Sequence, residues 1–159
     1  MIFKQWRQVL SGTKTQTRRL VRPDDYTWVN ALATVAGGMP PSIVITEVCG
    51  ISPSGRHYLK WAVGKTYTVQ PGQGKKSQGR TPPIRQIRRE RLGDISGEDS
   101  MAEGIILVPY EAYMCPVCHK AYEWPQEAYA CLWNCCGGRC ENDQNDDVWV
   151  LEFESGPGL

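Results

Sequence analysis

The first apolar positions of the chain fall at helical spacing. Trp6, Val9 and Leu10 lie at i, i+3 and i+4, which predicts a short amphipathic helix. Ser11-Gly12 predicts the end of that helix, because glycine adopts the left-handed conformation at no steric cost. A β-branched, alternating run from 13 to 17 follows directly and predicts a strand.

Side chains of the strand predicted at 13–17 alternate between two faces, so Lys14, Gln16 and Arg18 are expected to lie together. Ser52-Pro53-Ser54-Gly55 has turn composition and predicts a hairpin over residues 42–60. The remaining strands are expected at 63–70, 84–92 and 148–154.

Two of these strands have a distinctive apolar pattern. In the strand 84–92, Ile84 and Leu92 are in phase but Ile87 is not, which predicts a bulge or a change of register. The strand 63–70 is expected to turn a set of apolar side chains inward. That set is Val63, Tyr67 and Val69.

Two further helices are indicated by capping residues and spacing. Ser96 is the expected N-cap of the first, and Gly104 its end. Pro125 lies in the first turn of the second. The second helix has a buried stripe at i, i+3, i+4 and i+7, made of Tyr129, Leu132, Trp133 and Cys136. These elements predict an α+β protein.

The chain of 159 residues is long enough for one domain with its own hydrophobic core. We expect a single domain over 1–159, with insertions at about 23–60 and a cysteine-rich segment at about 113–141. The sequence contains neither a cleavable signal pattern nor a long apolar run. A cytoplasmic protein without membrane contact is therefore expected, with reduced or metal-bound cysteines.

Charge is distributed unevenly along the chain. Residues 1–92 contain 16 Lys and Arg against 4 Asp and Glu, whereas residues 93–159 contain 2 against 13. The net charge of +1 therefore conceals a basic half and an acidic half. Two outcomes are open: the basic half forms a surface for a polyanion such as RNA, or the two halves neutralise each other within the fold.

The cysteines suggest a metal site. Cys115-Pro116-Val117-Cys118 places two thiols in a tight turn from which both can bind one zinc ion. Cys131 and Cys135 lie at i, i+4 and can complete a four-cysteine site, with Cys140 as a substitute for one of them. We expect a structural zinc ion, and the alternative is unliganded thiols. Cys49 is expected to be simply buried, and Cys136 to be a small core residue.

Residues 10–19, Leu-Ser-Gly-Thr-Lys-Thr-Gln-Thr-Arg-Arg, resemble the signature of the ASCH family, small domains of the PUA-like superfamily. Three further blocks match in the same order, at 61–70, 94–104 and 148–153, so that the resemblance covers roughly two thirds of the chain. The chain is similar to phage- and prophage-type members, with a cysteine-rich insertion. The resemblance implies a PUA-like β-barrel with flanking helices, here with a zinc-stapled insertion, and association with RNA or modified nucleosides.

The same resemblance implies catalytic residues. In relatives that hydrolyse the acyl amide of N-acylated cytidine, a lysine, a threonine and a glutamate act as base, nucleophile and proton shuttle. By motif position these roles fall on Lys14, Thr17 and Glu103. Chemically, a threonine hydroxyl needs a neighbouring base, and a desolvated lysine can serve as one. Glu103 also lies in the last turn of its predicted helix, where the helix dipole disfavours a carboxylate, a conflict that functional residues tolerate.

Three functions remain open from the sequence. The first is the amidohydrolase, and the second is a non-catalytic module that binds RNA or a modified nucleoside. The third is a metal-dependent ribonuclease, for which the sequence offers no evident histidine or carboxylate cluster.

Candidate ligand-binding residues are basic or hydroxylic and lie in the motif and in the loop after the strand 63–70; they are Thr15, Arg18, Arg19, Lys75, Lys76 and Arg80. The arginines of the strand 84–92 are further candidates for phosphate contacts, and Trp61, Tyr67 and Trp28 are candidates for stacking on a base. The alternative for each tryptophan is a place in the core.

Overall fold

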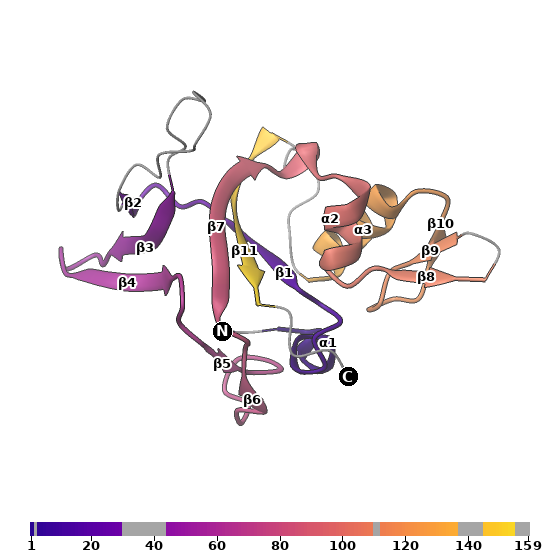
Figure 1. Ribbon diagram of the computed structural model, residues 1–159, viewed down its shortest axis with the longest axis horizontal. Coiled ribbons are helices and arrows are strands. Elements are labelled where there is room, and N and C mark those ends of the chain that lie inside the picture. Colours follow the sequence, from indigo (N-terminus) through magenta and orange to yellow (C-terminus); the bar gives the residue numbers. More distant parts are fainter. Residues whose placement is uncertain (2, 30–43, 110–111, 137–144, 155–159) are drawn as a thin grey trace, which may run out of the picture.

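The computed structural model describes residues 1, 3–29, 44–109, 112–136 and 145–154. It is an α+β structure of mostly antiparallel sheets with three α-helices, as the sequence predicts (Figure 1). In the described residues, the helices are α1 (Trp6–Leu10), α2 (Gly97–Ala102) and α3 (Pro125–Cys135), with a 3₁₀ turn at Leu92–Asp94. Among these residues, no helix is both long and apolar enough to cross a membrane.

The largest sheet has six strands. Its path runs β1-β11-β7-β3-β2, and β4 pairs with β3 outside this path. Every pairing in it is antiparallel. The strands are β1 (Gln16–Leu20), β2 (Asp25–Val29), β3 (Ile45–Ile51), β4 (His57–Ala62), β7 (Ile84–Arg91) and β11 (Asp147–Phe153). Residues 23–60, expected as an insertion, thus contribute strands to this sheet.

The sheet is curled. Trp149 on β11 donates its indole N–H to Asp25 on β2, with 2.9 Å between Nε1 and Oδ2. In a flat sheet these two strands would lie three spacings apart, about 14 Å. The curl brings the two ends of the sheet toward each other. Among the described residues no ladder joins β1 to β2 or β4, so the sheet does not close into the expected barrel.

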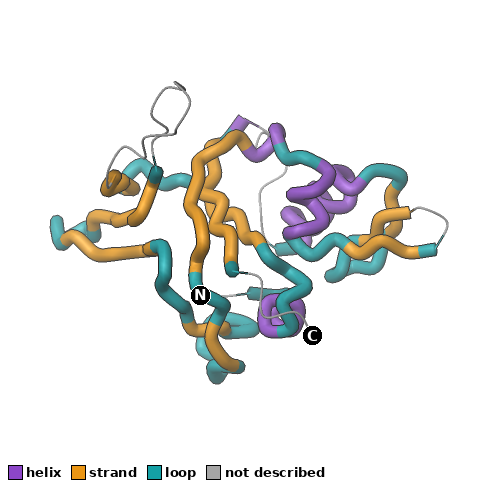
Figure 2. The backbone as a smooth tube through the Cα atoms, in the orientation of Figure 1, coloured by secondary structure: helices purple, strands orange, loops and turns teal. Residues whose placement is uncertain are grey.

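Strand β11 separates two hydrophobic cores because its side chains alternate between the faces of the sheet. Trp149, Leu151 and Phe153 pack in the core inside the curl, together with α1. Val148 and Val150 pack on the opposite side, against residues of α3. The outer core is covered by α2, α3 and a small sheet, which form one side of the molecule (Figures 1 and 2).

The smaller elements complete the two sides. The small sheet has the order β10-β9-β8, formed by β8 (Ile106–Val108), β9 (Ala112–Met114) and β10 (Ala121–Tyr122). A two-stranded ribbon, β5 (Thr68–Val69) with β6 (Gly79–Arg80), follows β4. Helix α2 begins as expected, because Ser96 accepts a hydrogen bond from the backbone N–H of Asp99 at 3.0 Å. It is followed by Gly104 with a φ of 93°.

The bulge predicted in β7 is present. Phe153 pairs with Ile84 and Glu152 pairs with Gln86, so Arg85 is the extra residue. Because of it, Ile84 and Ile87 are both buried although they lie three residues apart. The 42–60 hairpin is also confirmed as β3 and β4.

Three local predictions are wrong. The first strand begins at Gln16 instead of residue 13, since the backbone N–H groups of Lys14 and Thr15 bond to α1 and α2. Val63 is exposed, because it lies in the turn after β4. Cys136 follows the last turn of α3 and is exposed instead of packing in the core.

Candidate active site

A cavity of about 900 Å³ opens beside β1. Strand β1 is at one end of the sheet path, and side chains from both of its faces reach the cavity. Inside the curl the wall is formed by β4, and on the other side by α3. Its lining includes Lys14, Thr17, Arg18, Arg19, Glu103, Tyr58, Lys60, Trp61, Tyr129 and Trp133. The three residues expected to be catalytic therefore line one cavity, although Glu103 is distant from the other two in the chain.

Lys14 and Glu103 form a buried ion pair at this cavity. Each residue is 3% exposed. The ammonium of Lys14 contacts the carboxylate of Glu103 and also donates to the backbone carbonyl of Glu103 at 2.6 Å. Both groups are thus fixed in position, because the pair is held by a side-chain and a backbone contact. Glu103 occupies the C-cap of α2, so this contact also connects the cavity to that helix.

The surroundings of Lys14 shift its protonation equilibrium toward the neutral form, compared with a lysine in water. Burial lowers the pKa of Lys14, because the charged ammonium is removed from water. The carboxylate of Glu103 opposes this change, and the nearby charge of Arg19 reinforces it. On balance the pKa of Lys14 lies below its ordinary value, which is the direction that a lysine base requires.

Arg18 holds Glu103 in place. Its guanidinium donates to Glu103 at 3.1 Å, and it also contacts Glu90 and Asp99. Burial alone would lower the pKa of Arg18, but the charges of Glu103 and Glu90 raise it on balance. With its N–H groups engaged by three carboxylates and only 2% of the residue exposed, Arg18 positions Glu103 and is poorly placed to donate to a ligand.

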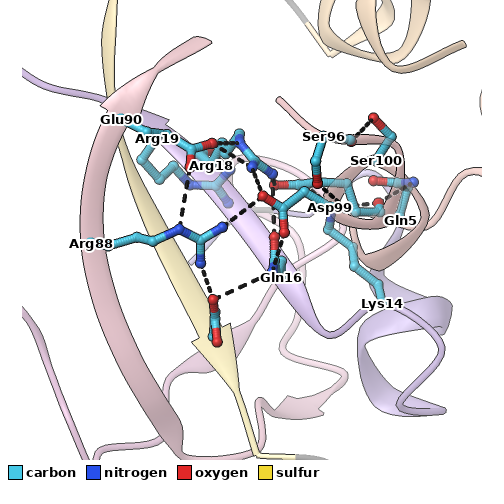
Figure 3. Close-up of polar contacts among 12 residues, drawn as sticks. Gln5, Lys14, Gln16, Arg18, Arg19, Arg88, Glu90, Ser96, Asp99 and Ser100 are labelled. Atoms are coloured by element: carbon cyan, nitrogen blue, oxygen red, sulfur yellow. Dashed lines mark hydrogen bonds and ion pairs between the residues drawn. The ribbon is translucent and has the colours of Figure 1, made fainter. Parts of the chain in front are cut away.

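The polar network extends from Arg18 to Arg88, Glu90, Asp99 and Gln16 (Figure 3). Arg88 on β7 contacts Glu90, Asp99 and Glu152, and Gln16 donates to Asp99 at 2.9 Å. The expected common face of Lys14, Gln16 and Arg18 is therefore occupied by acidic partners. No carboxylate cluster was evident in the sequence, yet Glu90, Asp99, Glu103 and Glu152 gather here. Arginines neutralise them.

Thr17 and Arg19 alternate with Arg18 along β1. Thr17 pairs with Leu151 across the ladder and is almost fully buried. Arg19 lies over the ring of Phe3, with 5.1 Å from its Cζ to the ring centroid, and donates to the carbonyl of Arg18 at 3.0 Å. The free side of β1 brings these side chains to the same cavity as Lys14 and Glu103.

Helix α3 supplies an aromatic wall. Tyr129 and Trp133 are in tilted ring contact, with centroids 6.3 Å apart. The hydroxyl of Tyr129 and the indole N–H of Trp133 are buried without a hydrogen-bond partner among the described residues. Burial raises the pKa of Tyr129 well above its ordinary value, so its hydroxyl keeps its proton. The periodicity of the sequence identified this stripe but predicted only a core role for it.

Other predicted ligand-binding residues lie elsewhere. Thr15, Lys75, Lys76 and Arg80 are not part of the cavity lining. Lys75 and Lys76 are exposed, and Arg80 donates to Thr66. Trp28 is exposed on β2, whereas Trp61 lines the cavity. The sequence did not identify Tyr58 and Lys60, because an exposed strand in a hairpin carries no periodic signal for a cavity.

The two charged halves of the chain meet in part through ion pairs. Of the eleven ion pairs among the described residues, seven join a basic residue before position 93 to an acidic residue after it. Arg88 and Arg89, which the sequence offered as phosphate contacts, are among them. Mutual neutralisation thus accounts for Lys14, Arg18, Arg85, Arg88 and Arg89.

A four-cysteine cluster joins α3 to the turn between β9 and β10. The sulfurs of Cys115, Cys118, Cys131 and Cys135 all lie within 4.8 Å of one another. Cys115 and Cys118 come from the turn, and the other two from α3. Cys140 lies outside the described residues. The set expected from the C-P-x-C turn and the i, i+4 spacing is therefore brought together.

The donor set fits zinc. A tetrahedral zinc ion with sulfur at about 2.3 Å holds its ligands about 3.8 Å apart, close to the observed spacing. A hydrogen bond from the backbone of Lys120 lowers the pKa of Cys118 to about 7, whereas burial and its sulfur neighbours raise the pKa of Cys135 to about 12. Several thiolates cannot form in this space without a cation. The cluster is thus suited to a metal ion such as zinc.

Comparison with known proteins finds no matching family model, no matching curated protein and no matching solved structure. Function is therefore inferred from the cavity, its charges and the motif in residues 10–19.

Proposed function

We propose that the chain is an amidohydrolase that removes the acyl group from an N-acylated cytidine. The observation that carries this proposal is that Lys14, Thr17 and Glu103 line one cavity, with Lys14 and Glu103 held as a buried pair. The resemblance of residues 10–19 to the ASCH signature supports it independently. We further propose that the curled sheet is a PUA-like relative with an open side at β1.

The reaction divides into two steps. The hydroxyl oxygen of Thr17 attacks the acyl carbonyl carbon while the neutral amine of Lys14 accepts the hydroxyl proton. The C–N bond then breaks, and the proton passes from Lys14 through Glu103 to the departing amine nitrogen. Cytidine leaves, and the acyl group remains as an ester on Thr17. Water, deprotonated by the same pair, then attacks the ester carbon; the C–O bond to Thr17 breaks, the proton passes to the Thr17 oxygen, and a carboxylic acid is released.

Arg18 and Arg19 act on different members of the catalytic pair. Arg18 holds one oxygen of Glu103, so that the other oxygen stays toward Lys14. The positive charge of Arg19 lowers the pKa of Lys14. Together they hold the Glu103 side chain in place and ease the loss of a proton from Lys14. Neither arginine needs to touch the substrate for these effects.

Zinc has a structural role in this proposal. The four cysteines join the β9–β10 turn to α3, and α3 carries Tyr129 and Trp133 at the cavity. Four cysteine sulfurs would fill the ligand positions of a tetrahedral zinc ion, as in structural sites, and would leave no open position for substrate. Zinc would fix the helix and thereby one wall of the cavity.

A non-catalytic module that binds a modified nucleoside or RNA is the second candidate. The specific observation in its favour is that the Lys14 ammonium already has two acceptors, both within Glu103. In this alternative the pair shapes the cavity and takes no part in catalysis. In that case Thr17 would donate a single hydrogen bond to a base, worth about 1 kcal/mol.

The deciding experiment is incubation of the zinc-loaded protein with N4-acetylcytidine and quantification of cytidine and acetate. We expect both products in equal amounts. Lys14→Ala and Glu103→Gln should lower the rate by orders of magnitude, whereas Lys75→Ala, outside the cavity, should not. Binding of N4-acetylcytidine without formation of either product would favour the non-catalytic module.

A further inference from the structure

The cavity is strongly basic. Its lining contains six basic residues and one acidic residue, Glu103; the basic ones are Lys4, Lys14, Arg18, Arg19, Arg22 and Lys60. A neutral nucleoside gives such a lining no charge to bind. Cavities lined by one sign of charge concentrate ligands of the opposite sign.

The basic residues include a paired and an unpaired set. Lys14, Arg18 and Lys60 have carboxylate partners, which are Glu103 for the first two and Asp25 for Lys60. Lys4 and Arg22 have no ion-pair partner in the part of the chain that the structure describes. Lys4 donates there to the backbone carbonyl of Cys135. These two cations are therefore available to an anion.

Lys4 and Arg22 lie at the exposed end of the cavity, where the outer end of a bound substrate would be. Lys4 and Arg22 are exposed, so they lie where the cavity meets solvent, whereas Lys14 and Glu103 are buried at its floor. A substrate whose acyl amide reaches Lys14 must point its opposite end outward. In an N-acylated cytidine the amide is on the base, and the sugar 5′ oxygen lies at the far end of the molecule. A phosphate on that oxygen would therefore point toward the exposed part of the cavity lining, to which Lys4 and Arg22 belong.

We infer that the substrate is a nucleotide: an N-acylated cytidine carrying a 5′-phosphate, which Lys4 and Arg22 bind at the cavity mouth. This inference rests on the proposed function, since it places the acyl amide at Lys14. A mononucleotide is favoured over RNA because several described candidates for phosphate contacts are ion-paired or lie outside the cavity. Arg88 and Arg89 are ion-paired, and Lys75 and Lys76 do not line the cavity.

Binding of the reaction product tests the inference without requiring turnover. Dissociation constants of CMP and cytidine are measured by titration calorimetry at low salt. CMP should bind about tenfold more tightly, since a charge-assisted hydrogen bond contributes about that factor. The difference should shrink as salt is raised, because the two cations are exposed. Equal affinities, or binding of neither compound, would overturn the inference.

A matched pair of variants assigns the effect to these residues. Lys4→Gln with Arg22→Gln should remove most of the preference for CMP. Lys65→Gln with Arg91→Gln removes the same charge from exposed positions outside the cavity and should preserve it. If both pairs reduce the preference equally, the phosphate is attracted by overall charge and the assignment to Lys4 and Arg22 is wrong.

Turnover separates this inference from the proposed function. The values of kcat/KM are compared for N4-acetyl-CMP, N4-acetylcytidine and a short RNA containing N4-acetylcytidine. Faster hydrolysis of the mononucleotide supports the inference. Equal rates for the nucleoside and the nucleotide overturn it but leave the hydrolase intact, and a preference for RNA overturns the choice of a mononucleotide. A CMP preference without hydrolysis of any substrate supports the phosphate site and contradicts the hydrolase.

Discussion

The ammonium of Lys14 is held by the side chain and the backbone carbonyl of Glu103, 89 residues later in the chain. Both side chains are only 4% exposed. A buried ion pair adds little net stability, because desolvation offsets the attraction between the charges. A pair retained at a cavity beside a buried threonine is better explained by chemistry than by stability.

The pH dependence of hydrolysis should follow the state of Lys14. Only neutral Lys14 accepts a proton, so kcat should rise with pH until its lowered pKa is passed. Arg19 lowers that pKa, so Arg19→Gln should raise it and shift the rising limb to higher pH. Arg80→Gln, outside the cavity, is the control and should leave the profile in place. If the rising part of the pH profile does not move in Arg19→Gln, the charge of Arg19 has no effect on the pKa of Lys14.

Two neighbouring arginines on β7 should differ in their effect on stability. Arg88 contacts three carboxylates and its side chain is 27% exposed, whereas Arg89 has one partner, Asp147, and is 53% exposed. Arg88→Ala removes one cationic partner from each of three partly buried carboxylates and should cost about 1–3 kcal/mol of unfolding free energy. Arg89→Ala should cost less than about 1 kcal/mol. Urea denaturation measures both, and equal losses would contradict the importance of the network.

Much of the fold follows from local sequence rules. The alternation in β11, the bulge at Arg85 and the Ser96 cap each follow from a few adjacent residues. The curl of the sheet does not, because it depends on the contact between Trp149 and Asp25, which are 124 residues apart. For this reason the sequence could indicate strands and their order, but not whether the sheet closes.

The candidate site was also predictable only where local sequence patterns determine it. The spacing of Cys131 and Cys135 on one helix identified them as candidate metal ligands, and the motif identified Lys14 and Thr17 as candidate catalytic residues. The partners of Arg18 were hidden because Glu90 and Asp99 come from two other elements. A basic residue in a motif therefore looked like a ligand contact, when it is engaged by buried carboxylates.

Removing the metal should destabilise the protein. Purified protein should contain close to one zinc ion per chain, and chelation should lower Tm, because an ion held by the four cysteines would join the β9–β10 turn to α3. Cys131→Ser should lose the metal. Cys136→Ser, at the position directly after Cys135 but outside the cluster, should retain it. A metal-free protein with unchanged Tm would show that the four thiols need no ion.

Acid should weaken the network around Asp99. Burial alone would raise the pKa of Asp99, but the hydrogen bond from Gln16 and the charges of Arg88 and Arg18 lower it on balance. Its contribution to stability is therefore present above its ordinary pKa of 3.8 and is lost as pH falls through the lower, folded value. Asp99→Asn should flatten this loss in denaturation curves below about pH 4. Asp94→Asn, at an exposed position, is the control; a loss of the same steepness in Asp99→Asn would contradict the linkage.

The most direct test of the hydrolase is Thr17→Val, which removes the hydroxyl and nearly preserves the shape. Turnover of N4-acetylcytidine and binding of cytidine are measured on the same preparation. With Thr17 as the nucleophile, turnover should fall by several orders of magnitude, while the dissociation constant of cytidine changes by less than about tenfold. Turnover in Thr17→Val within about tenfold of the unmodified protein would contradict a nucleophilic role for Thr17.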